Sequence, residues 1–525
     1  MKIKLNEIND ERNYRKLKNQ NKFDEIHLKN KQTNLFIIIL FSIIFILLIL
    51  FLVFKSYKNE SENKKNIKCE PGYKLNDGNF SLNYTFKAIF RTYIENEKIN
   101  IINCHPKNII KMVINETEVQ PWIDFIFPTP GEHIIFLKLN LTNKNSFSGL
   151  FFKIQNMIYF SFSSIFKSNS ININITNISY MFFDCSSLNF IDFNNFRMYK
   201  ITNMTGLFYG CSSLSSLDLS NFDTQNVLEM DYLFSYCSSL TTIDLSKFIT
   251  TNLQSMKGMF FGCISLLNID LSNFNTNKVT DMSTLFYQCK SLKKINITKI
   301  NTERVINMHK MFTHCTSLTS IDLSSFNTQN VNDLNNMFSG CKSLISVNLS
   351  NFDTSKVKSL WGLFNDYKSL KSFDISGFNT KNVTNMNYMF YGCNSLTSIN
   401  LNNFDTQNVT EMIFMFADCY SLKYVNVLGF NTENVRDLSY LFYSCKSLSS
   451  IDLKNFKTSN IKDMSRMFYN CNNLKYLDIS SFETNSSSNV TLFENIPSFG
   501  EIKIKKSFLN KISDKILLDW NKILF

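Results

Sequence analysis

Cysteines recur every 26 residues through most of this chain. The interval is broken at one place, where Tyr367 occupies the position of a cysteine. Twelve copies of one unit, without an insertion or deletion, are typical of a stacked array, because periods of about 20 to 50 residues mark solenoids and related repeat folds. The evenly spaced cysteines are Cys185, Cys211, Cys237, Cys263, Cys289, Cys315, Cys341, Cys393, Cys419, Cys445 and Cys471.

One unit, 227–252, shows two kinds of periodicity. Apolar residues from Val227 to Leu240 recur at spacings of three and four, which predicts a helix with Thr224 as its N-cap. From Leu240 to Phe248 the pattern L-x-x-I-x-L-x-x-F predicts a short strand. The expected fold class is therefore α/β: a curved leucine-rich-repeat solenoid of 26-residue strand–helix units, preceded by one transmembrane helix and a small β cap.

The predicted transmembrane helix rests on an apolar run near the N-terminus. Leu35 to Phe54 contains one serine and no charge, and twenty helical residues span a bilayer core of about 30 Å. Residues 1–33 carry nine Lys or Arg, which favours a cytoplasmic N-terminus. All fourteen Asn-x-Ser/Thr sequons follow the run. We therefore expect a single-pass type II protein of the cell membrane, with the bulk of the chain extracellular and glycosylated.

These features predict six segments. They are a basic cytoplasmic tail (1–33), a transmembrane helix (34–54), a juxtamembrane linker (55–97), an N-terminal β cap (98–149), the solenoid (150–496) and a C-terminal cap (497–525). Within the solenoid we expect a degenerate first unit and then twelve regular units from about residue 181.

The repeated run MFxxCxSLxxIDLSxFxTxNVxxM, seen at Met389–Met412 and Met337–Leu360, resembles the BspA-like leucine-rich repeat surface proteins of bacteria and protists. The resemblance covers about residues 150–525. It implies a cell-surface protein with adhesion as its role. It implies no particular ligand, and that family has no catalytic residues to carry over.

The cysteine column has three possible roles: packing, disulfides or metal ligation. Packing is favoured, because Tyr367 interrupts the column without disturbing the period and because cysteine is often buried. Zinc sites need ligands at short spacings, and the sequence has no C-x-x-C. Cys69 and Cys104 lie outside the array and form the candidate disulfide in an oxidising compartment.

A second column consists of acidic residues, or Asn in some units, at the outward position of each predicted strand. On the concave face of a solenoid this column would be a candidate ligand-binding surface for a cation, a hydroxyl-rich glycan or a basic partner. The alternative is a solvated polar ladder without a ligand. The acidic members are Asp192, Asp218, Asp244, Asp270, Asp322, Asp374, Asp452 and Asp478.

Catalysis is not expected. The sequence has no phosphate loop, nucleophile elbow or metalloprotease motif, and a metal role for His309 and His314 is less favoured than a surface role. We expect no cofactor and no nucleic-acid partner, since the net charge of +12 forms no dense basic stripe. The predicted function is adhesion to, or binding of, an extracellular protein or glycan. A passive coat or spacer and an intracellular membrane-tethered scaffold are the alternatives.

Overall fold

A computed structural model of the chain describes residues 83–524, apart from 105, 141–144, 163–174, 194–199, 372–373, 484–490, 498–499 and 513–519. Contacts divide the chain into Met1–Phe80 and Ser81–Phe525, and every described residue belongs to the second unit. The predicted tail (1–33), the predicted membrane helix (34–54) and most of the predicted linker (55–97) lie outside the described residues.

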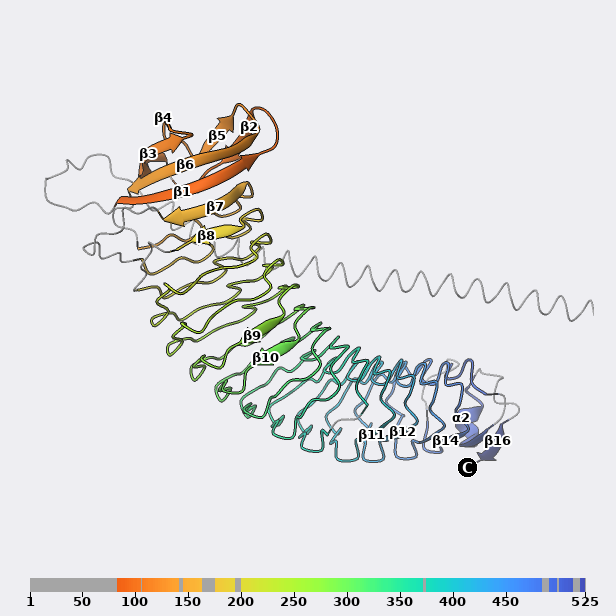
Figure 1. Cartoon of the computed structure of the whole chain (residues 1–525). Coiled ribbons are helices and arrows are strands. Elements are labelled where there is room, and N and C mark those ends of the chain that lie inside the picture. The colour runs from red at the N-terminus through yellow and green to blue at the C-terminus, as the bar shows by residue number, and fades with distance from the viewer. Residues whose placement is uncertain are drawn as a thin grey trace, which may run out of the picture. The chain divides into compact units, whose positions relative to one another are not determined.

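The second unit begins with a six-stranded sheet in the order β4-β3-β6-β1-β7-β8 (Figure 1). Its strands pair antiparallel until β7, which pairs parallel with β8. The change of direction marks the start of the repeats. The bounds are β1 Asn83–Thr92, β3 Ile109–Ile114, β4 Thr117–Val119, β6 Gly131–Asn140, β7 Met157–Phe162 and β8 Phe190–Asp192; a separate ribbon pairs β2 Glu97–Asn100 with β5 Asp124–Phe127, and a 3-10 turn, η1, covers Pro106–Asn108. The sheet thus starts at Asn83, inside the segment predicted as a linker.

The repeats add short parallel strands in an unshifted 26-residue register, so that Ile269 pairs with Ile295 and Ile399 with Val425. Among the described residues, only some neighbouring units pair their strands in this way. A four-stranded parallel group closes the C-terminal end, together with the short helix α2. The bounds are β9 Asn268–Asp270, β10 Lys294–Asn296, β11 Ser398–Asn400, β12 Tyr424–Asn426, β13 Ser450–Asp452, β14 Tyr476–Ile479, β15 Glu501–Ile504, α2 Lys506–Leu509 and β16 Asn521–Leu524.

The predicted helix of each repeat is absent from the described units, so the α/β strand–helix fold class was wrong. The array is a β-solenoid. Between Val227 and Leu240 the chain forms consecutive turns: the N–H of Leu233 donates to the carbonyl of Met230, three residues earlier (3.3 Å), and the N–H of Tyr232 donates to Lys257 of the next unit (2.7 Å). An α-helix would instead direct each N–H to the carbonyl four residues earlier.

Residues with a left-handed backbone explain why the spacing of three and four residues predicted a helix that does not form. Tyr232 and Tyr236 have φ angles of 54° and 58°, and the corresponding positions of the other units are also left-handed. Two left-handed residues, four positions apart in each unit, interrupt a right-handed helix. Consecutive turns nevertheless return the chain to the same side every three or four residues, so the apolar pattern of a helix appears without the helix.

No helix in the described part of the chain is both long enough and apolar enough to cross a membrane. This finding corrects the prediction of a single-pass type II membrane protein with an extracellular bulk. The run from which that prediction was made lies among residues outside the described ranges.

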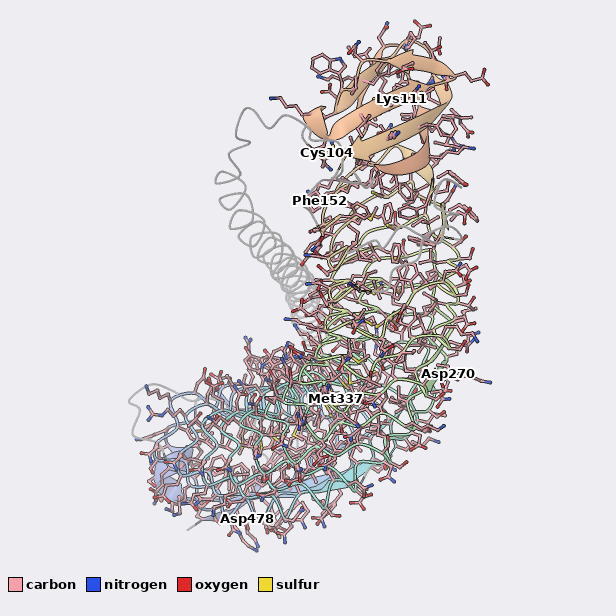
Figure 2. The ribbon with its side chains drawn as sticks, turned by 90° about the vertical axis from the view of Figure 1, so that its left-hand side faces the viewer. Cys104, Lys111, Phe152, Asp270, Met337 and Asp478 are labelled. Carbon is pink, nitrogen blue, oxygen red and sulfur yellow. The ribbon has the colours of Figure 1, made fainter. Side chains whose placement is uncertain are left out.

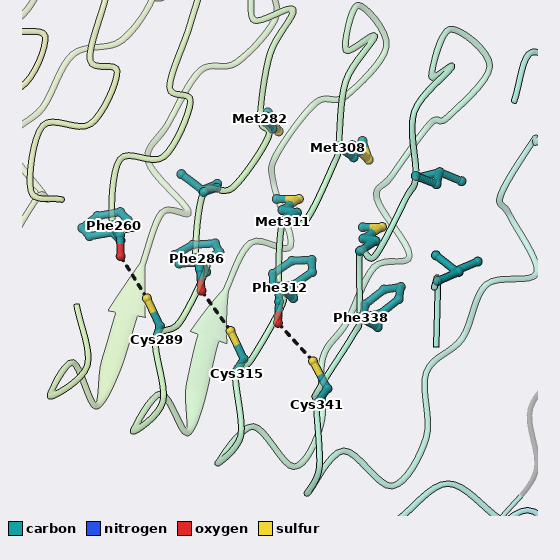
Figure 3. Packing of buried hydrophobic residues seen from close by; sticks show 14 of the residues in the cluster. Phe260, Met282, Phe286, Cys289, Met308, Met311, Phe312, Cys315, Phe338 and Cys341 are labelled. Carbon is teal, nitrogen blue, oxygen red and sulfur yellow. Dashed lines mark hydrogen bonds between the residues drawn. The ribbon is translucent and has the colours of Figure 1, made fainter. Parts of the chain in front are cut away.

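The core consists of columns of identical side chains that run from unit to unit. Each cysteine of the array is fully buried, and its thiol donates to the carbonyl of a phenylalanine in the preceding part of the array. That phenylalanine lies 34 residues earlier for Cys185 and 29 residues earlier for the others, as for Cys289 and Phe260 (3.1 Å) (Figure 3). The phenylalanine rings stack on one another, with 5.6 Å between the centroids of Phe260 and Phe286. Because neighbouring units supply the burial, the array is stable only as a stack.

Units lie closer together on the turn side than on the strand side. Ring centroids are 4.5 Å apart for Phe261 and Tyr287 on the turn side, and 6.3 Å apart for Phe248 and Phe274 beside the strands. On the turn side, bridges link Ser146 to Asn177 and continue from unit to unit through most of the array. The strand side is therefore the outer side of the array.

Candidate ligand-binding ladder

The acidic and amide residues at the central outward position of the strand segments form one row, which we call the outer ladder. Figure 2 shows Asp270 and Asp478 along the outer edge. This differs from the concave placement expected from the sequence, because the tight hydrogen-bonded turns occupy the inner side. Most members are exposed or half-buried, whereas Asp478 is buried. The row comprises Asp192, Asp218, Asp244, Asp270, Asn296, Asp322, Asn348, Asp374, Asn400, Asn426, Asp452 and Asp478.

A backbone hydrogen bond fixes most side chains of the outer ladder. The N–H of Ser246 donates to Oδ1 of Asp244 (2.8 Å), and the N–H of Ser350 donates in the same way to Asn348 (3.0 Å). This is the side-chain turn that Asp and Asn form two residues before a backbone donor. Either residue supplies the oxygen, which explains why both occur in the row.

The same hydrogen bonds favour the charged form of the carboxylates. They hold the pKa of Asp244 below its ordinary value, through the backbone N–H and then the hydroxyl of Ser246. The pKa of Asp322 is lowered by Ser324 in the same way. The outer ladder is therefore a row of oriented anionic and amide oxygen acceptors.

A shallow depression of about 670 Å³ lies on the outer ladder where β9 and β10 pair. Its polar lining comes from four consecutive units, and partly or fully buried isoleucines lie between the polar groups. The lining residues are Thr242, Ile243, Asn268, Ile269, Asp270, Lys293, Lys294, Ile295, Asn296, Ser320, Ile321 and Asp322.

Sequence reasoning identified Asp270 and Asp322 here but missed Asn268, Lys293 and Lys294. Asn268 and Lys294 stand two residues before the acidic column, and side chains two apart share a face of a strand. That spacing was the available signal. It was obscured because the column varies among Ser, Thr, Asn, Lys, Tyr and Phe.

The other candidate residues do not gather into a reactive site. Among the described residues, no group of three or more His, Cys, Asp or Glu could hold a metal ion. His309 Nδ1 lies 3.5 Å from Asp333 on the turn side. Burial raises the pKa of the Cys263 and Cys341 thiols to about 12. Cys69 of the predicted Cys69–Cys104 disulfide lies outside the described residues, so that pairing stays a prediction.

The stacked units and their exposed ladder define a leucine-rich-repeat-like solenoid protein. More particularly, the chain belongs to the family described as "Mycoplasma protein of unknown function, DUF285", which matches residues 176–294, 261–347, 321–424 and 397–506.

Similarity to other proteins is limited. No curated protein matches the sequence. Among solved structures, the chain is similar to the one titled "Crystal structure of TLR13-ssRNA13 complex", at 13% identity over 64% of this chain and 71% of that chain, with a TM-score of 0.17. At this TM-score the similarity supports no argument about ligand or mechanism.

Proposed function

We propose that this protein is a non-catalytic binding protein, that its role is adhesion to a protein or glycan, and that the outer ladder is its binding surface. The oriented row of oxygen acceptors is the observation that carries the proposal. A BspA-like surface role agrees with the repeated motif at Met389–Met412. The absence of catalysis remains part of the proposal.

Electrostatics favour a partner on the outer ladder. Carboxylates in neighbouring units of the outer ladder, such as Asp218 and Asp244, repel each other. The Asp244 charge indeed raises the pKa of Asp218, although the hydrogen bonds to Ser220 outweigh it. A ligand that donates hydrogen bonds along the row would relieve this repulsion.

A passive spacer is the second candidate function, and one observation favours it. Backbone capping alone accounts for the Asp or Asn at most positions, because one side-chain oxygen is enough for the turn. On this reading the row contributes to folding and solubility without a ligand.

A charge-removal experiment on the full chain separates the two candidates. The variant Asp218→Asn/Asp244→Asn/Asp270→Asn keeps the capping oxygens but removes three charges. The matched control, Asp281→Asn/Asp437→Asn/Asp463→Asn, removes three carboxylates that cap identical turns on the inner side. Binding to immobilised matrix proteins and glycans is measured for both.

We expect at least tenfold weaker binding for the outer variant and little change for the control. Equal effects of the two variants would contradict the outer ladder as the binding surface. If the unmodified chain is retained by no immobilised partner, the passive spacer is favoured instead.

A further inference from the structure

We propose that the depression lined by residues 242–322 binds a neutral linear polysaccharide, which runs along the array from unit to unit. This inference rests on the proposed binding function and names the ligand class. Three features of the depression support this inference: the isolated pair of strands that lies in it, the charges of both signs that form no salt bridge with one another, and the distance between neighbouring strands.

The backbone ladder is interrupted on both sides of the depression. β9 and β10 form a two-stranded sheet with each other, and the flanking segments 242–244 and 320–322 form no strand with them. The depression therefore lies where an isolated pair of strands meets flanking segments that are not strands.

The depression is lined by equal numbers of positive and negative side chains. Lys293 and Lys294 contribute two positive charges, and Asp270 and Asp322 two negative ones; within the described part of the depression, no salt bridge joins these four groups. A polyanion or a polycation would leave half of them facing a like charge. A hydroxyl accepts from an ammonium and donates to a carboxylate, so a neutral sugar chain suits both signs.

The acceptors are already positioned. The N–H of Ser272 donates to Oδ1 of Asp270 (2.8 Å), and the N–H of Ser324 donates to Oδ1 of Asp322 (2.9 Å). A carboxylate accepts about four hydrogen bonds, so both side chains keep acceptor capacity toward solvent. A ligand therefore meets side chains that need little further ordering.

The spacing favours a sugar chain over a peptide. Paired strands such as β9 and β10 lie about 4.8 Å apart, whereas an extended peptide repeats every two residues, roughly 6.6 Å. A pyranose unit in an extended chain has a length close to the strand spacing, so one sugar can face each unit. Ile269 and Ile295 offer apolar contact to the sugar rings between the polar groups.

The test is native electrophoresis of the full chain in gels that contain amylose, mannan, xylan or galactan. A gel with dextran sulfate tests whether the chain binds a polyanion instead. The site variant is Asp270→Ala/Lys294→Ala. The control, Asp374→Ala/Lys371→Ala, removes the same residue types elsewhere on the outer ladder, including a carboxylate that caps the same turn. Thermal melting shows that both variants fold.

We expect at least one neutral polysaccharide to retard the chain, with an affinity at least tenfold weaker in the site variant and within twofold in the control. No retardation by any neutral polysaccharide, preferential retardation by dextran sulfate, or equal loss in both variants would overturn the inference. If a matrix protein is still bound through the outer ladder in that case, the proposed function survives. If no partner is bound, both fail.

Discussion

The ring of Tyr232 lies over the backbone of Gly258 in the next unit. A Cβ at Gly258 would lie 2.5 Å from Cδ1 and Cε1 of that ring. Gly258 has a φ of 56° and forms a left-handed turn. Tyr180 and Gly206 are related in the same way one unit pair earlier, so aromatic ring and glycine alternate over these four units on the turn side.

Replacing Gly258 with alanine should therefore destabilise the array. The left-handed backbone costs about 1 to 2 kcal/mol with a side chain, and the clash with Tyr232 adds about 1 kcal/mol. Urea unfolding measures the change. Gly377→Ala is the control, since its φ is not positive and its nearest contact is 3.4 Å. In a Tyr232→Ala background, the loss of unfolding free energy caused by Gly258→Ala should fall to the contribution of the left-handed backbone alone. An undiminished loss would show that the ring of Tyr232 does not clash with the new side chain.

Tyr367→Phe should stabilise the protein. Tyr367 fills the cysteine column and is fully buried, and its hydroxyl has no hydrogen-bond partner. An unpaired buried hydroxyl costs about 1 to 3 kcal/mol, so its removal should raise the free energy of unfolding by about 1 kcal/mol. Tyr367→Cys restores the column residue but leaves a cavity, and should lose about 3 kcal/mol. A less stable Phe variant would show that the hydroxyl is satisfied.

Asp231→Asn should change the pH dependence of stability. Burial raises the pKa of Asp231 from 3.8 to about 6, although Ser255 and the N–H of Lys257 donate to it. The pKa of Asp231 is higher in the folded chain than in the unfolded chain. The carboxyl therefore favours folding below about pH 4, and this contribution to stability is lost as the pH rises through 6. Asn335 makes the same two hydrogen bonds with Ser359 and Trp361, so the substitution preserves the geometry.

The amide introduced by Asp231→Asn cannot ionise, so the variant and the parent should be equally stable at pH 4. At pH 7 the variant should be more stable by about 1 to 2 kcal/mol, less than the full shift implies because solvent reaches the carboxyl. Thermal melting at the two pH values is the measurement. A difference that is constant across this range would exclude the titration as its cause.

Thr302→Val should be costly although the side chains have the same shape. The Thr302 hydroxyl donates to the carbonyl of Asn327 (2.8 Å) and accepts from the N–H of Asn327 (2.7 Å). Valine leaves both backbone groups unpaired, at a cost of about 2 to 3 kcal/mol. Thr302→Ser keeps both hydrogen bonds and should lose under about 1 kcal/mol. Similar losses for the two variants would mean that the methyl group, not the hydroxyl, matters.

These threonines also show where sequence reasoning failed. Thr224 was predicted as a helix N-cap, but its hydroxyl bonds the backbone of Ile249 in the next unit. Both arrangements use a hydroxyl to satisfy a backbone N–H. The local sequence is the same for either, because the partner lies 25 residues away.

The sequence by itself determined the 26-residue period and the solenoid class. Positions such as Leu233, Phe234 and Cys237 were recognised as one buried face, and they are buried. Such features depend on hydrophobic periodicity, which is a local property of the chain. The acidic column could be recognised for the same reason, as could its outward orientation on a strand.

Tertiary structure decided how the units stack. Turns replaced the predicted helix because N–H groups such as that of Tyr232 find carbonyls in the next unit, and no local pattern encodes a partner 25 residues away. The side on which Asp270 lies followed from the same contacts, since continuous hydrogen bonding draws the turns together and leaves the strands apart. Periodicity fixes which side chains are buried together, whereas interunit hydrogen bonds fix the backbone conformation and the bend.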